Sequence, residues 1–145
     1  MTSPRWLVLT WRLPSASSTA RVATWRSLQR LGAVTLTPGA AILPYSEHLL
    51  EQLEWVAEDV VQRGGDAYVL PVTELTEADE DDIKRRMRDE RRGEYTRVRL
   101  AASRVRDSRE LAAVRRGLAR AVERDHFAST GRTAAERAVR RAAKE

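Results

Sequence analysis

The 145-residue chain contains no cysteine, which excludes disulfide bonds and thiolate chemistry and favours a reducing compartment. It has no apolar run near the roughly 20 residues that span a bilayer, and its N-terminus lacks the apolar segment of a signal peptide. We therefore expect a soluble, cytoplasmic protein without a membrane partner. The only two histidines, His48 and His126, lie far apart without acidic neighbours at ligand spacing, so we expect no metal site.

Motifs of catalysis are also missing. The chain has no glycine-rich phosphate loop, no dinucleotide fingerprint and no nucleophile elbow. The acidic residues between Glu77 and Asp82 lack the pattern and the glycine of a calcium loop and are typical of a helix start. We therefore expect no cofactor, no catalytic residue and no enzymatic activity.

Lysine is scarce, with two residues against 24 arginines, and the charge is unevenly placed. Residues 1–75 hold six Arg and seven acidic residues, whereas residues 76–145 hold eighteen Arg and two Lys against fourteen acidic residues, a net of +6. A basic segment attracts polyanions such as nucleic acid. An arginine-rich codon bias and solvated helix faces would give the same composition, so both interpretations stay open.

Residues 5–44 predict a strand, a helix and a hairpin. Residues 5–11 are bulky and β-branched, and Pro14 ends that strand. Helical spacing follows at Val22, Trp25, Leu28 and Leu31, with Ser17, Ser18 or Thr19 as the N-cap and Gly32 at the end. Residues 33–37 and 40–43 form strands around Thr37-Pro38-Gly39-Ala40, which favours a type II turn.

The next segment completes an α+β domain. Ser46 can cap a helix with its apolar face at Leu49, Leu53, Val56 and Val60, and Gly64-Gly65 separates it from a strand over residues 67–72. The order predicts a ferredoxin-like βαββαβ sheet with both helices on one face and the first and third strands central. The other face needs a cover, which the C-terminal helices or a second subunit in a homodimer could supply.

Residues 76–145 predict a helical extension of two to three helices. The first runs from Thr76 to about Arg106, with Gly93 as a candidate interruption and apolar positions at Ile83, Met87, Tyr95, Val98, Ala102 and Val105. Asp107 and Glu110 resemble a capping box for the second, and a third starts at Thr133 with Glu136 completing its box. We expect domains at 1–75 and 76–145, with the extension packed on the first.

Two groups of arginines are binding candidates. The candidates for DNA or another polyanion are Lys84, Arg85, Arg88, Arg91, Arg92, Arg115 and Arg116, with Arg120 on the same helix as the last two. Exposed helices laced with Glu and Asp show the same pattern.

The second group, Arg12, Arg21 and Arg26, surrounds the start of the first helix, where an oxyanion would gain backbone N–H donors. The alternative is that these are surface arginines whose stems cover Trp11 and Trp25.

Several motifs resemble the N-terminal domain of the chromate-resistance ChrB family. They are Arg21-Val22-Ala23-Thr24-Trp25-Arg26-x-Leu28, Leu31-Gly32-Ala33, Gly39-x-x-x-Leu43-Pro44, Gly64-Gly65-x-Ala67, Glu94-Tyr95 and Arg124-Asp125-His126-Phe127. The front half is also similar to the ferredoxin-like domain of phenylacetate-type repressors and of small CRISPR-adaptation nucleases. Those nucleases use an acid at the end of the first strand, where this chain has Thr10-Trp11-Arg12.

The resemblance implies a cytoplasmic protein connected with chromate resistance and with regulation of chromate efflux genes. Full-length members carry a second, C-terminal domain with no counterpart in these residues. Three hypotheses follow: a regulatory module that contacts DNA or an acidic partner through its basic helices, a non-catalytic dimerisation scaffold, or, with least support, an enzyme acting on an oxyanion or nucleic acid. Chromate or another oxyanion is a further candidate ligand.

Overall fold

A computed structural model describes residues 3–15 and 17–144. Contacts divide the chain into two compact units, Met1–Asp81 and Asp82–Glu145. The division falls inside a helix that begins just after the predicted boundary. The first unit combines strands and helices and the second is helical, so the predicted α+β class is confirmed.

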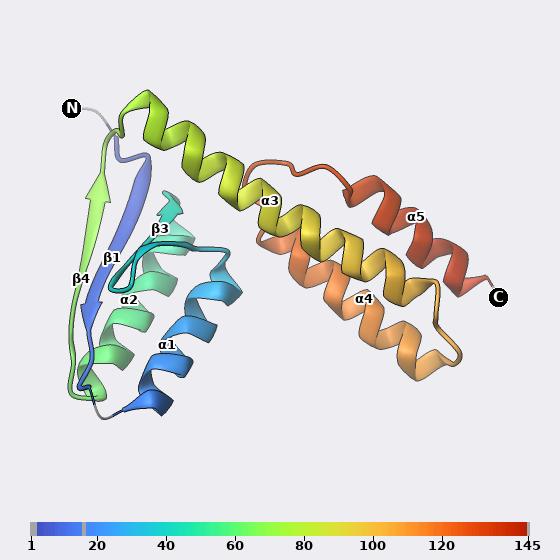
Figure 1. Ribbon diagram of the computed structural model, residues 1–145, viewed down its shortest axis with the longest axis horizontal. Coiled ribbons are helices and arrows are strands. Elements are labelled where there is room, and N and C mark those ends of the chain that lie inside the picture. The colour runs from blue at the N-terminus through green and yellow to red at the C-terminus, as the bar shows by residue number, and fades with distance from the viewer. Residues whose placement is uncertain (1–2, 16, 145) are drawn as a thin grey trace. The chain divides into compact units, whose positions relative to one another are not determined.

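The first unit has the element order β-α-β-β-α-β (Figure 1). Its elements are β1 (Trp6–Arg12), α1 (Ser18–Leu31), β2 (Val34–Thr37), β3 (Ala40–Pro44), α2 (Glu47–Gln62) and β4 (Asp66–Val72). The strands pair antiparallel in the order β2-β3-β1-β4, so β1 and β3 are central, as expected. Leu7 lies opposite Leu43 on β3 and Pro71 on β4.

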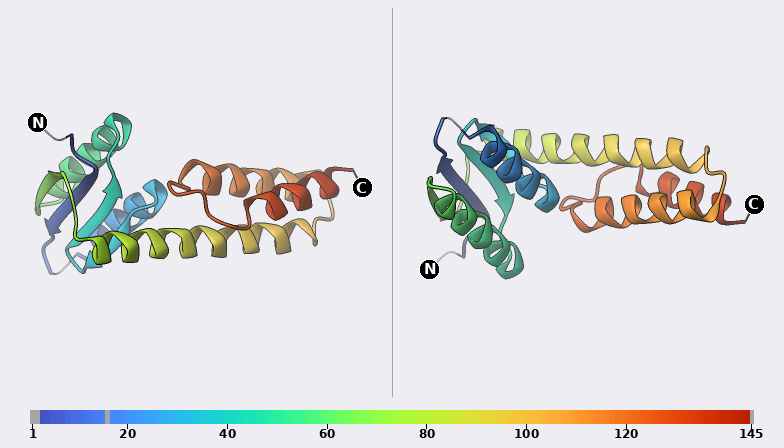
Figure 2. Two further views of the ribbon diagram at one scale, coloured as in Figure 1. Left: turned by 90° about the horizontal axis from the view of Figure 1, so that it is seen from above. Right: turned by 90° about the horizontal axis from the view of Figure 1, so that it is seen from below.

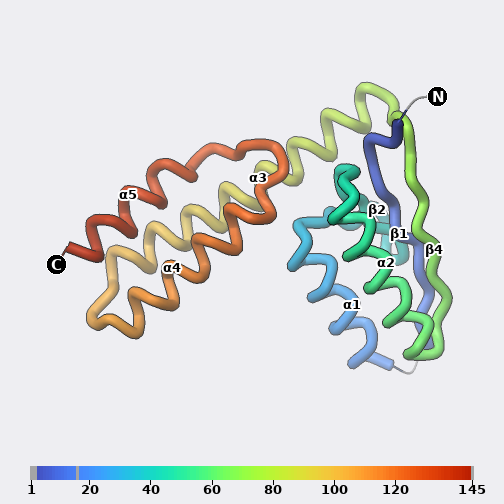
Figure 3. The backbone as a smooth tube through the Cα atoms, turned by 180° about the vertical axis from the view of Figure 1, so that it is seen from behind, coloured from blue at the N-terminus to red at the C-terminus, as the bar shows by residue number. Residues whose placement is uncertain are grey.

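Both helices of the first unit cover one face of the sheet (Figure 3). Leu7 and Leu9 of β1 meet Leu28 of α1 and Leu53 of α2 in one buried cluster. The four apolar positions predicted for α2 are all buried. Burial of such side chains contributes about 1.5–3 kcal/mol each, so this cluster is the main stabilising feature of the unit.

Local capping follows the sequence closely. The Ser17 hydroxyl accepts the Ala20 N–H at 3.2 Å and begins α1, and the Ser46 hydroxyl accepts the Leu49 N–H at 3.0 Å and begins α2. Gly32, with φ of 81°, ends α1. These predicted helix limits are confirmed.

The turn between β2 and β3 differs from the predicted type II turn. Its third residue, Gly39, is not among the residues with positive φ that a type II turn requires. Glycine is needed there for space, because a Cβ would lie 2.8 Å from the Trp11 carbonyl oxygen. The close approach lets the Trp11 N–H donate to the Gly39 carbonyl at 2.9 Å. Nothing in the residues around the turn indicates that another strand presses on it.

Two adjacent glycines follow α2 and meet different demands. Gly64 has φ of 91°, a left-handed conformation that side chains disfavour. Gly65 has ordinary φ, but a Cβ there would collide with the Arg12 carbonyl at the end of β1. The pair therefore turns the chain from α2 into β4 in the space beside β1.

The second sheet face is only partly buried. Trp6 is 2% exposed, and Val34 and Ile42 are also buried. Tyr68 and Leu70, which lie opposite Thr10 and Val8 on the same face, are exposed. The need for a cover, inferred from the sequence, is thus met over part of the face.

The second unit consists of α3 (Glu77–Ala102) from residue 82 onward, α4 (Ser108–Glu123) and α5 (Arg132–Ala143), which run side by side (Figure 2). Tyr95 and Val98 of α3, Ala121 of α4 and Val139 of α5 share its buried cluster. None of the helices in the described ranges is long and apolar enough to cross a membrane.

Two predicted helix limits in this unit were wrong. Helix α3 ends at Ala102 rather than near Arg106, and Gly93 does not interrupt it. Helix α5 starts at Arg132, its N-cap is Gly131 in a left-handed conformation, and no side chain caps it. The Glu136 carboxylate instead accepts from Arg132 Nε at 2.8 Å, so the predicted capping box does not form.

Candidate nucleic-acid interface

Arg91, predicted as a surface contact for a polyanion, lies inside the second unit. Its side chain is 4% exposed, and α3 buries it in line with Met87 and Tyr95. Spacing explains the position, because residues four apart share one face of a helix. The predicted apolar face of α3 had a gap at residue 91, and that gap was the signal for a buried arginine. Arg91 is therefore not part of an exposed basic surface.

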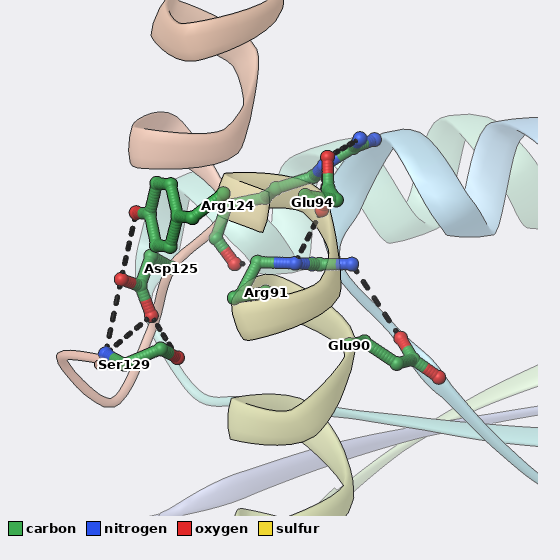
Figure 4. Close-up of polar contacts among 7 residues, drawn as sticks. Glu90, Arg91, Glu94, Arg124, Asp125 and Ser129 are labelled. Carbon is green, nitrogen blue, oxygen red and sulfur yellow. Dashed lines mark hydrogen bonds and ion pairs between the residues drawn. The ribbon is translucent and has the colours of Figure 1, made fainter. Parts of the chain in front are cut away.

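A carboxylate holds Arg91 and a second arginine together. The side chain of Glu94 is 12% exposed and forms an ion pair with Arg91, whose Nε lies 2.5 Å from the carboxylate. Both oxygens of the same carboxylate accept hydrogen bonds from Arg124 (Figure 4). The Arg91 guanidinium also reaches the Glu90 carboxylate at 3.5 Å and the Arg124 carbonyl at 3.4 Å. Two cations thus face two anions, which is the arrangement that makes buried charge tolerable.

A second set of hydrogen bonds adjoins this cluster. The Tyr95 hydroxyl donates to Asp125 Oδ2 at 2.8 Å, and both the N–H and the hydroxyl of Ser129 donate to the same carboxylate (Figure 4). Ala128, between them, has φ of 51°. The Asp125 carboxylate therefore fixes the tight loop between α4 and α5 against α3.

The environment shifts three pKa values in this network. Burial lowers the pKa of Arg91, and the Glu94 carboxylate opposes that change. Burial raises the pKa of Glu90 despite the nearby Arg91 and Arg86. Burial, followed by the hydrogen bond to Asp125, raises the pKa of Tyr95. A raised pKa means that Glu90 and Tyr95 each hold their proton more tightly than the free residue does; an arginine stays charged even when buried.

The network joins elements that are distant in sequence. Glu94-Tyr95 and Arg124-Asp125, two separate motifs of the chain, contact each other across 30 residues. Phe127 belongs to the same region, because its carbonyl accepts from Arg88 Nε at 3.1 Å and its ring lies 5.5 Å from Lys84 Nζ. No local pattern predicts such pairing. These contacts hold α3 to the loop before α5.

The other predicted cations of α3 also have contacts of their own. Arg85 pairs with Asp82, Arg92 pairs with Asp89 at 2.6 Å, and Arg88 holds the Phe127 carbonyl. The exposed ion pairs of Arg85 and Arg92 are weak, yet each places a carboxylate beside the guanidinium that a phosphate would contact. The α3 row therefore carries less free positive charge than its sequence suggests.

Helix α4 presents the cleaner basic face. Its apolar positions Leu111, Val114, Leu118 and Val122 pack against the buried cluster of the unit. The opposite face exposes Arg109, Arg116 and Arg120, whereas Arg115 is exposed nearer the apolar side of the helix, one turn from Leu111. None of these four has an acidic partner in the part of the chain that the structure describes. Arg115 and Arg116 were predicted candidates. Arg109 was missed, although its spacing to Arg116 and Arg120 marks the same face.

The second predicted group, the oxyanion candidates, is not gathered into one pocket. Arg12 pairs with Asp66 at 3.3 Å beside a hollow of about 300 Å³, and Arg21 donates to the Ser15 carbonyl at 2.9 Å. Arg26 is exposed on α1. Oxyanion binding by this group stays a prediction.

His48 is exposed on α2, and His126 is half-buried in the loop after α4. Within residues 3–15 and 17–144, no group of three or more His, Cys, Asp or Glu side chains could hold a metal ion.

Comparison with known proteins agrees with these motifs. The family described as "Protein ChrB, N-terminal" matches residues 21–103, more than half of the chain. The chain belongs to the ChrB N-terminal family. It is 39% identical over 67 residues to Protein ChrB of Cupriavidus metallidurans, a match covering 46% of this chain and 21% of that protein. The matched part thus spans about a fifth of that relative's length. No solved structure matches the chain.

The segment that matches the ChrB family contains only some of the residues of the buried network. Glu94 and Tyr95 lie inside the matched segment, whereas Arg124 and Asp125 lie beyond its end. The ion pairs therefore attach the family segment of α3 to the remainder of the second unit. The basic face of α4 also lies beyond residue 103.

Proposed function

We propose that this chain is a regulatory module associated with chromate resistance and that its second unit contacts DNA. The observation that supports the contact is the positive net charge of the second unit. Residues 82–145 hold eighteen Arg and two Lys against ten acidic residues, a net of +10, and α4 turns unpaired arginines to solvent. Such a surface neutralises phosphates and releases counterions, a driving force that needs no base contact.

The contact surface of the proposal is the α4 face with Arg109, Arg116 and Arg120. Arginine gives bidentate hydrogen bonds to phosphate oxygens. Helix α4 is 16 residues long, and three guanidinium groups on its outer side can contact neighbouring phosphates of one duplex. The engaged residues Arg85 and Arg92 of α3 would contribute less, because each has a carboxylate partner.

Anisotropy of a short labelled duplex tests the proposal. Binding should weaken steeply between about 50 mM and about 200 mM salt. A variant with Arg109→Gln, Arg116→Gln and Arg120→Gln should bind at least about tenfold more weakly, and its salt slope should fall by about 0.9 for each phosphate that it no longer neutralises.

The matched control carries Arg21→Gln, Arg26→Gln and Arg30→Gln on α1, which removes the same charge from the first unit. Its affinity should stay near that of the wild type. Undetectable binding at low salt, or equal losses in both triple variants, would contradict an interface on α4.

We also propose that the chain acts by binding rather than by catalysis. The half-buried carboxylates of Glu94 and Asp125 both have partners, two arginines for the first and Tyr95 and Ser129 for the second. Carboxylates held this way are poor general bases, because their lone pairs already accept hydrogen bonds. Turnover of chromate or nucleic acid that a single substitution abolishes would overturn this part of the proposal.

A further inference from the structure

The charged residues on the solvent face of α2 are all acidic. The helix buries Leu49, Leu53, Val56 and Val60 and contains no Lys or Arg. On the opposite side, Glu47, Glu51, Glu54 and Glu58 recur at i, i+4, i+7 and i+11, and all four are exposed. We call this set the acidic row. Only Glu58 has a side-chain hydrogen bond within the described residues, a 3.5 Å contact from Gln62.

An exposed tryptophan borders the acidic row. Trp55 is 61% exposed, one position from Glu54 along the helix. It also lines a groove of about 170 Å³ between α1 and α2, together with Ser27, Arg30 and Gln52. A tryptophan beside carboxylates is a favourable surface for guanidinium groups, which pair with the acids and stack on the ring. The chemistry of a matching partner is therefore a row of arginines.

Helix α4 carries a row of that kind. Arg109, Arg116 and Arg120, the basic row, follow the spacing i, i+7 and i+11, the same as Glu47, Glu54 and Glu58. At about 1.5 Å rise per residue, both rows extend over about 16 Å. Each row lies directly opposite the face that its own helix buries, so both are accessible along their length.

The net charges of the two units also support a match between the acidic row and the basic row. Residues 1–81 hold six Arg against eleven Asp and Glu, a net of −5, whereas residues 82–145 have a net of +10. Oppositely charged surfaces steer association and fix its orientation. Both surfaces belong to the same chain, so every copy offers one of each.

We propose that the acidic row and Trp55 of one copy bind the basic row of a second copy. The contact joins different surfaces, so it is heterologous and proceeds head to tail. It does not rest on the proposed DNA contact, since it forms without nucleic acid. If both occur, DNA and the second copy compete for α4.

Sedimentation velocity of the full chain without DNA tests the association. At about 50 mM salt the sedimentation coefficient should rise with protein concentration, and at about 500 mM salt the rise should vanish, because salt screens exposed charge. A coefficient independent of concentration at low salt would overturn the proposal, even if the chain binds DNA.

Charge reversal locates the contact. Glu51→Arg with Glu54→Arg, and separately Arg116→Glu with Arg120→Glu, should each weaken self-association about tenfold or more. An equimolar mixture of the two variants should associate again, because the intact basic row of the first fits the intact acidic row of the second, and the two reversed rows also carry opposite charge. Failure of the mixture to associate would contradict the pairing.

Matched controls change the same charge elsewhere. Glu74→Arg with Asp81→Arg, and Arg137→Glu with Arg140→Glu, alter exposed positions outside the two rows. Both controls should associate like the wild type, and circular dichroism should show that every variant is folded. Equal loss in controls and row variants would leave only net charge as the cause and would overturn the assigned surfaces.

Discussion

The two units of this chain differ in what fills their interiors. The first packs large aliphatic side chains such as Leu7, Leu9 and Leu53 between a sheet and two helices. The buried cluster of the second holds one tyrosine, two valines and three alanines, with only partly buried leucines and valines of α4 packed against it, and an arginine–carboxylate network adjoins it. Small side chains bury little apolar area, so tight helix packing and the ion pairs of this network must supply more of the specificity there. Because Arg91 and Arg124 take part in this network, not every arginine of the basic second unit is available to a partner.

Removing a large apolar side chain should have the largest effect, in the first unit. Leu53→Ala should lower the free energy of unfolding by about 2–5 kcal/mol, from lost burial and the cavity left behind. Urea unfolding followed by circular dichroism measures the change. Leu36→Ala, at an exposed position of β2, should cost far less; a loss for Leu53→Ala no larger than this control would show that the aliphatic cluster is not the main support.

Removing a buried cation should have the next largest effect, in the second unit. Arg91→Ala leaves the Glu94 carboxylate with one of its two partners and should cost about 3 kcal/mol. The neighbouring Arg92→Ala removes an exposed ion pair and should cost less than about 1 kcal/mol. Similar losses for the two substitutions in urea unfolding would mean that burial does not distinguish them.

Removing one hydroxyl should have the smallest effect. Tyr95→Phe deletes the donor to Asp125, which keeps both bonds from Ser129, so the expected loss is about 1–2 kcal/mol. The pKa of Tyr95 is raised, so the folded protein holds this proton more tightly than the unfolded chain. The stabilisation is complete below about pH 10 and declines as pH rises above it.

The pH profile separates this contact from general destabilisation. Part of the wild-type loss of stability above about pH 10 should be absent in Tyr95→Phe, which lacks the phenol that titrates. Identical alkaline profiles for the wild type and Tyr95→Phe would show that the phenol does not couple folding to pH.

Local rules predicted most of the first unit. Ser17 and Ser46 act as caps because a hydroxyl at that position accepts an N–H that the helix leaves free, and Leu49 to Val60 are buried because their spacing follows the helix. The turn at Gly39 could not be predicted in this way. Its geometry depends on the carbonyl of Trp11, which lies on another strand.

The candidate site was harder to predict than the fold, because a buried arginine and an exposed arginine look the same in the sequence. Arg88, Arg91 and Arg92 are close in sequence, yet only Arg91 falls on the buried face of α3. Helical spacing could have separated it. Its partner Arg124 and the Tyr95–Asp125 bond depend on how the helices fold back, which no local pattern encodes.

The glycine pair after α2 has a consequence for inherited variation. At position 64 the demand is conformational, so residues that tolerate left-handed backbone, such as asparagine, are acceptable replacements. At position 65 the obstacle is the backbone carbonyl of Arg12, which no rotamer can move away, so even alanine is excluded. Two identical, adjacent residues thus face unequal selection, which is stricter at Gly65 than at Gly64.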